Sequence, residues 1–213
     1  MSKKTGPKPT FTATDAVRAA TEIGLGNFTL SEVARRLGVA TPSLYRVISS
    51  REDLVGMCLD DVNSEMLRRA QSIDGTWQDC IRAMTNLLWS MLEEVKGLDR
   101  VLLGATAHTH FVQLFEFIGK MILERGFHGG PSRVMFALNF VSDTVLAAHL
   151  QLVALREHLG DELSENPEAH TTESDTAAVE NEFRIVPTQQ WGERGWVDRK
   201  VDFIIAGFER NLD

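Results

Sequence analysis

The sequence lacks the features of secreted and membrane proteins. It has only two cysteines, Cys58 and Cys80, in 213 residues, which excludes a disulfide framework and fits a reducing compartment. No apolar run approaches the roughly 20 residues that a membrane-spanning helix needs. The basic N-terminus is not followed by an apolar stretch, so no secretory signal is expected. We therefore expect a cytoplasmic protein with no membrane partner.

Motifs of enzymes and cofactor-binding proteins are also missing. The sequence has no nucleophile elbow, no phosphate-binding loop and no metal-ligand spacing such as HExxH or CxxC. His108 and His110 are two residues apart, so they would not share a face of a helix. We expect a protein that is not an enzyme and that holds no metal and no cofactor. The enzymatic alternative would have to use Asp143 and His108 as an acid–base pair.

Positive charge is scarce overall but concentrated at one end. The formal net charge is −8, which by itself argues against nucleic acid. However, residues 1–55 hold eight Lys/Arg and five Asp/Glu, whereas the remainder holds 14 basic and 25 acidic residues. A basic end on an acidic body indicates an attached nucleic-acid-binding module, because its field would steer that end towards phosphates.

Helical periodicity dominates the chain. Apolar residues recur at spacings of three and four over residues 77–95, 134–155 and 197–212, and each set forms one stripe on a helix. No segment alternates with period two, so an all-α fold is expected. Residues 161–182 contain eight acidic residues and no Lys or Arg, which is typical of a solvated, mobile loop.

Two segments with helix-start signals flank a glycine turn near the N-terminus. Thr29 and Glu32 match a capping box, and Gly38 suits the positive φ that ends a helix and turns the chain. Thr41 is placed to cap the next helix, with Pro42 in its first position. A second capping box is predicted at residues 49–52, opening a helix that runs to about residue 72.

A short helix, a tight turn and a second short helix form the arrangement that reads DNA, with the second helix in the major groove. Arg46 is predicted to pair with guanine, and Thr41, Pro42 and Ser43 to contact neighbouring bases. Tyr45 and the helix starts suit phosphates. The predicted DNA-binding residues are Thr29, Ser31, Thr41, Pro42, Ser43, Tyr45, Arg46 and Arg51. A plain helical hairpin with a polar surface is the alternative.

The segment FTLSEVARRLGVATPSLYRVISSREDL resembles the DNA-binding segment of the tetracycline-repressor (TetR) family. The residues that carry the resemblance are Thr29, Val33, Ala34, Gly38, Val39, Leu44, Tyr45, Arg51 and Leu54. Members usually have a histidine two residues after the tyrosine, then an aromatic residue or valine. Here Val47 and Ile48 stand at these positions, so the phosphate contact of that histidine does not carry over. The resemblance implies a helix-turn-helix of three helices over residues 1–55 and a helical ligand-binding and dimerisation domain over residues 56–213, with the flexible acidic loop at about 160–182.

A homodimer is expected, because one short reading helix makes too few contacts for specific binding and two half-sites are normally joined. The apolar stripes of the helices at 134–155 and 197–212 are the predicted interface. Its residues are Val134, Leu138, Val141, Val145, Val197, Val201, Ile204 and Phe208. The alternative is that both stripes face the core of the single chain.

A pocket for a small, mostly apolar effector is predicted between the helices that start near Trp77, Asp99, His110 and Pro131. Its predicted lining residues are Trp89, His108, Phe111, Phe115, Asn139 and Asp143. Asn139 and Asp143 lie one helical turn apart, and a buried Asp143 would need a partner. Together with this predicted pocket, the resemblance implies a repressor that binds a palindromic double-stranded operator and releases it when the effector binds. The alternative is a helix-turn-helix regulator or activator without small-molecule input.

Overall fold

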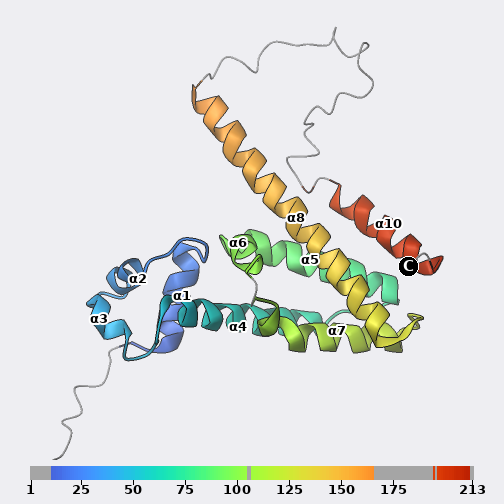
Figure 1. Cartoon of the computed structure of the whole chain (residues 1–213), viewed down its shortest axis with the longest axis horizontal. Coiled ribbons are helices and arrows are strands. Elements are labelled where there is room, and N and C mark those ends of the chain that lie inside the picture. Colours follow the sequence, from blue (N-terminus) through green and yellow to red (C-terminus); the bar gives the residue numbers. More distant parts are fainter. Residues whose placement is uncertain (1–10, 105–106, 166–193, 195, 212–213) are drawn as a thin grey trace, which may run out of the picture. The chain divides into compact units, whose positions relative to one another are not determined.

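The computed structural model describes residues 11–104, 107–165, 194 and 196–211, and over these residues the chain forms helices and no strand, which confirms the all-α fold (Figure 1). The helices are α1 (Ala13–Ile23), α2 (Leu30–Arg36), α3 (Thr41–Leu44), α4 (Arg51–Ala70), α5 (Trp77–Glu94), α6 (Leu98–Leu102), the 3₁₀ helix η1 (Ala107–Phe111), α7 (Val112–Glu124), α8 (Gly130–Glu165) and α10 (Val197–Glu209).

Capping boxes open three of the helices. Threonine hydroxyls accept hydrogen bonds from the third residue of α1, α2 and α5, and the acidic side chain of that residue accepts one from the threonine backbone N–H. The pairs are Thr12–Asp15, Thr29–Glu32 and Thr76–Asp79. The Thr29–Glu32 pair was predicted, and α2 begins at the expected residue. Such caps satisfy N–H groups that a helix start otherwise leaves unpaired.

The helix α4 belongs to two groups of helices. Its side chains contact α1 and also α5, α7 and η1. The chain divides into two compact units, but the boundary lies inside α8, between Leu138 and Asn139. The helix α4 joins the first three helices to the following ones within the first unit. The domain boundary at residue 55 stays a prediction.

Two contacts hold the N-terminal helices to the turn between α5 and α6. The backbone N–H of Leu25 donates to the carbonyl of Lys96 at 2.8 Å. Gly97 has a φ of +78°, and a Cβ there would lie 2.5 Å from the backbone nitrogen of Gly26. Only glycine fits this position, because any side chain would collide with backbone atoms that cannot move away.

The helix α8 has a buried stripe and an apolar exposed face. Val134, Leu138, Val141 and Val145 are buried, whereas Met135, Phe136 and Phe140 are 42%, 53% and 47% exposed. By length and composition alone, Gly130–Arg156 is apolar enough to cross a membrane, contrary to the sequence prediction. One such helix is weak support for a membrane protein, because core helices of soluble bundles have the same composition.

The C-terminal region agrees in part with the predicted boundaries. The helix α8 continues to Glu165, beyond the predicted apolar stripe at 134–155 and into the first part of the predicted acidic loop. Residues 166–182 of that loop lie outside the described residues. The helix α10 begins where the predicted apolar stripe at 197–212 begins, ends at Glu209, and has five buried residues.

Candidate functional site

The core of the helix-turn-helix comes from a few buried side chains around a glycine turn. Val33, Ala34 and Leu44 are buried between α2 and α3. Gly38 has the predicted positive φ, +68°, and the next backbone N–H, from Val39, donates to the carbonyl of Ala34 at 2.9 Å. The turn is thus closed by a backbone hydrogen bond, and the two short helices are fixed at an angle to each other.

The helix α3 begins one residue earlier than a Thr41 cap requires. Its N-cap is Ala40, which has no side-chain cap, while Thr41 is the first helical residue and Pro42 the second. Thr41 therefore does not cap the helix, and the prediction was wrong by one position. Pro42 suits this position because it has no N–H to leave unpaired.

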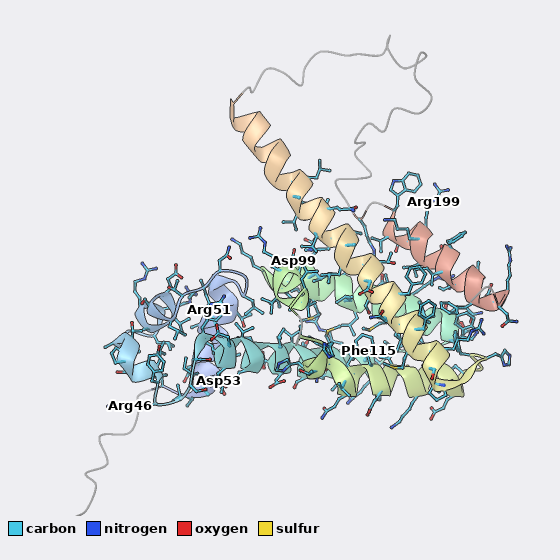
Figure 2. The ribbon with its side chains drawn as sticks, in the orientation of Figure 1. Arg46, Arg51, Asp53, Asp99, Phe115 and Arg199 are labelled. Carbon is cyan, nitrogen blue, oxygen red and sulfur yellow. The ribbon has the colours of Figure 1, made fainter. Side chains whose placement is uncertain are left out.

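The surface of α3 and of the turn that follows it is polar and accessible. The chain continues past Leu44 through backbone hydrogen bonds from Arg46 to Ser43 and from Val47 to Leu44, at 3.2 and 2.9 Å. Tyr45 is 57% exposed, and Pro42 and Arg46 are also exposed, whereas Thr41 and Ser43 are half-buried. Figure 2 shows Arg46 at the outer edge of the helix-turn-helix. We call Pro42, Tyr45 and Arg46 the reading surface.

A capping box holds the start of α2. Glu32 accepts hydrogen bonds from the backbone N–H and the hydroxyl of Thr29, both at 2.8 Å. These bonds favour the carboxylate and hold the pKa of Glu32 below its ordinary value of 4.5. Ser31 is exposed in the first turn. The hydroxyl hydrogen of Thr29 is taken by Glu32, so any phosphate contact of Thr29 would have to use the acceptor side of that hydroxyl or the helix backbone.

Arg51 is half-buried within the helix-turn-helix domain, the head of the molecule formed by α1, α2, α3 and the start of α4. Its guanidinium donates to the carbonyl oxygens of Phe28, Gly26 and Leu25 at 2.9, 3.3 and 3.5 Å and lies 4.7 Å from the centre of the Phe28 ring. Figure 2 shows Arg51 between the helices. The prediction of a phosphate contact was wrong, because the guanidinium is hydrogen-bonded to these carbonyls. It thereby joins α4 to the loop between α1 and α2.

The start of α4 is also shifted by one residue from its prediction. Its N-cap is Ser50, whose hydroxyl accepts a hydrogen bond from Asp53 N–H at 3.0 Å. The carboxylate of Asp53 accepts from the N–H and hydroxyl of Ser49, at 2.6 and 2.8 Å. The acidic partner is therefore Asp53 and not Glu52. These bonds lower the pKa of Asp53 below its ordinary value.

The two histidines near residue 109 have different surroundings. His108 is exposed on η1, while the Nδ1 of His110 lies 2.6 Å from the Oδ1 of Asp60 on α4. The ring of His110 lies over Gly56, since a Cβ at that glycine would be 3.2 Å from His110 Cε1. Over the described residues, no group of His, Cys, Asp and Glu is arranged to hold a metal ion. The contact of η1 with α4 was not predicted.

The predicted effector residues divide into two sets. Phe111 is buried at the end of η1, and Trp89 and Phe115 are half-buried on α5 and α7. Figure 2 shows Phe115 on the side of α7 that faces α5. His108, Asn139 and Asp143 are exposed, so the prediction of a buried Asp143 was wrong. On α8 the inward positions are those of Val141 and Val145, and Asn139 and Asp143 lie away from that stripe.

The predicted dimer interface was assigned to the wrong faces. All eight residues are buried within the single chain, at 7% exposure or less. They are Val134, Leu138, Val141, Val145, Val197, Val201, Ile204 and Phe208. A side chain that is already buried in one chain cannot present itself to a second copy, so these stripes face the core of the single chain.

Comparisons with known proteins agree with this geometry. The family described as bacterial regulatory proteins, tetR family, matches residues 14–57, which span α1 to the first part of α4. The HTH-type transcriptional repressor DrrR1 of Streptomyces coeruleorubidus is 37% identical over 83 residues. That match covers 37% of this chain and 31% of the relative, so it spans about a third of that repressor's length.

Solved structures resemble nearly the whole chain at low identity. The regulator SCO7222, a TetR from Streptomyces coelicolor, has a TM-score of 0.63 and 20% identity and covers 93% of this chain and 97% of its own. A single-residue variant of TetR from Acinetobacter baumannii AYE, in complex with minocycline, has a TM-score of 0.59 and 18% identity, covering 94% and 96%. ActR from Streptomyces coelicolor in complex with (S)-DNPA has a TM-score of 0.58 and 16% identity, covering 96% and 100%. The motif, the fold and these matches together lead to one conclusion: residues 14–57 form a helix-turn-helix DNA-binding domain of the kind found in the tetR family of bacterial regulatory proteins, on a chain whose helical fold is that of the solved TetR structures.

Proposed function

We propose that the chain represses transcription as a homodimer on a palindromic operator and that a small, mostly apolar effector releases it from DNA. The observation that carries the proposal is the reading surface. A short helix after a glycine turn holds an exposed proline, tyrosine and arginine outward over the buried Leu44. Such a surface suits the major groove, where an arginine pairs with the O6 and N7 of guanine.

The homodimer is supported by the need for two reading heads and by the exposed face of α8. Met135, Phe136 and Phe140 are large apolar residues on the outward side of this helix. Contiguous apolar surface of this kind marks protein–protein contacts. We assign this face to a second copy of the chain, because two-fold dimers are the commonest assembly and a palindrome requires two-fold symmetry.

Effector control is supported by the contacts between the head and the helices that follow it. The helix α4 packs on α1 and on α5, α7 and η1. The Leu25–Lys96 hydrogen bond and the His110–Asp60 contact add two further connections. An effector that shifts α5–α7 would therefore move the reading surface. A coupling of ~1–3 kcal/mol would change operator affinity about 5–150-fold.

The relatives point to effectors of moderate size. Two structures of similar fold hold minocycline and (S)-DNPA. For this chain we expect a mostly apolar molecule, because the inward residues Trp89, Phe111 and Phe115 are aromatic. Pockets lined by aromatic side chains with a few polar groups suit such ligands.

Footprinting on DNA that flanks the gene for this chain tests the proposal. We expect protection of two half-sites about one helical turn apart, loss of protection with an active effector, and a salt dependence with a slope near about −7 if eight phosphates are contacted. A flat salt response, or no protected sequence, would contradict DNA binding by the basic end. Protection that no compound in an apolar library relieves would contradict effector control alone.

A further inference from the structure

One polar residue interrupts the buried stripe of α4. Leu59, Met66 and Ala70 are buried on this helix, and Asn63 lies among them with 7% exposure. The Oδ1 atom of Asn63 is fully buried and has no hydrogen-bond partner. A buried amide oxygen without a donor lowers stability by about the free energy of a lost hydrogen bond, and native proteins keep few such groups.

A neighbouring helix shows how the same chain satisfies a buried polar group. Thr85 on α5 is even less exposed than Asn63, and its hydroxyl donates to the carbonyl of Ile81 at 2.9 Å. By contrast, no donor among the described residues forms a hydrogen bond to the amide oxygen of Asn63. Asn63 lies on a helix that packs against α5, α7 and η1, so a small molecule held among these helices would lie beside α4.

The helices around α4 are rich in methionine. Five of the seven methionines of the chain lie at buried or half-buried positions of α4, α5 and α7: Met57, Met66, Met84, Met91 and Met121. Methionine is unbranched and polarizable, so it repacks around apolar molecules of different shape at little strain. The interior of this unit thus combines adaptable apolar walls with one unsatisfied hydrogen-bond acceptor.

We propose that Asn63 is the polar anchor of the effector site, and that its amide oxygen accepts a hydrogen bond from the hydroxyl of a small aromatic molecule enclosed by α4, α5 and α7. The ligand class is therefore an apolar ring compound with one hydroxyl donor. The inference rests on the proposed effector control, but it concerns binding and is tested without DNA.

The test uses the intact protein and two probes that differ in one group, 2-naphthol and 2-methylnaphthalene. Binding of each is measured by equilibrium dialysis to the unchanged protein, to Asn63→Leu and to Asn86→Leu, a control at an exposed asparagine of α5. The ratio of the two dissociation constants removes the general hydrophobicity of the probes. We expect Asn63→Leu to reduce the preference for the hydroxyl about fivefold to tenfold, the value of one hydrogen bond, and Asn86→Leu to leave it unchanged.

Thermal unfolding of the ligand-free proteins gives a second readout. Leucine has a similar volume and no unsatisfied oxygen, so Asn63→Leu is expected to raise the Tm by about 2–4 °C. A structural asparagine with an internal partner would give a lower Tm on the same change. A lower Tm together with an unchanged hydroxyl preference overturns the proposal.

Two other outcomes separate this inference from the proposed function. If neither probe binds saturably to the unchanged protein, the interior site is overturned. If 2-naphthol binds through Asn63 but does not weaken operator binding at saturation, the site stands and effector control by this class of molecule is contradicted.

Discussion

The helix-turn-helix and α8 both leave large side chains exposed, but the two surfaces differ in chemistry. Around α3 the exposed residues include Tyr45 and Arg46, which offer a hydroxyl and a guanidinium. On α8 they are Met135, Phe136 and Phe140, with no polar group among them. Polar and cationic groups gain by replacing water with phosphates and base edges, whereas exposed apolar groups gain only by leaving water.

This difference identifies the kind of partner that each surface suits. The surface on α3 is suited to a duplex, and the face of α8 to another protein surface. The distribution of charge agrees with this assignment. Residues 56–213 are acidic and repel phosphates, whereas residues 1–55 are basic and attract them. The two surfaces can therefore be tested separately by substitutions that change one and leave the other intact.

The largest effect is expected from the face of α8. Placing carboxylates in an apolar contact, by Phe136→Asp together with Phe140→Asp, should separate the dimer and lower operator affinity by more than about 100-fold, because the two heads lose their effective concentration. Sedimentation velocity and fluorescence anisotropy measure the two quantities. Gln151→Asp, at an exposed polar position of α8, is the matched control. A double variant that remains dimeric would show that the interface lies elsewhere.

A smaller and more specific effect is expected at the reading surface. Arg46→Ala should weaken binding to the operator about tenfold to a hundredfold, since a guanine pairing contributes about 1–3 kcal/mol. Binding to unrelated DNA should change much less. Arg82→Ala, an exposed arginine of α5, controls for the loss of charge. Equal losses on both DNAs would make Arg46 a phosphate contact.

A substitution of Arg51 tests whether this arginine stabilises the fold or contacts DNA. Arg51→Lys loses most of the hydrogen bonds to the α1–α2 loop, so we expect a fall of about 1–3 kcal/mol in the free energy of unfolding. The salt slope of DNA binding should stay the same, because no phosphate contact is removed. Thermal unfolding and salt titrations test both statements, and a reduced slope with unchanged stability would restore the phosphate role.

The smallest effect concerns the cap of α2. The folded pKa of Glu32 lies below its ordinary value of 4.5, so its stabilising effect is present above that value and is lost as pH falls through the lowered pKa. The Tm of the unchanged protein should therefore fall towards that of Glu32→Gln as the pH drops below about 4.5. A difference in Tm that is constant from about pH 7 to about pH 3 would show that the carboxylate charge plays no part in the cap.

The sequence predicted local features of the head better than the choice of helix faces. The Thr29–Glu32 cap and the positive φ of Gly38 depend on residues within one turn, so the pattern alone was sufficient. The helix α8 is apolar on two sides, and periodicity cannot tell which side a single chain buries. Arg51 contacts carbonyls more than 20 residues away in the sequence, and the missing partner of Asn63 becomes visible only when its neighbours are placed.

The placement of the reading surface in a major groove is tested most directly by methylation protection of guanine N7. We predict one protected guanine in each half-site with the unchanged protein, and loss of that protection with Arg46→Ala at concentrations that still saturate the DNA. Protection that persists unchanged in Arg46→Ala, or protection that never occurs in the major groove, would contradict it.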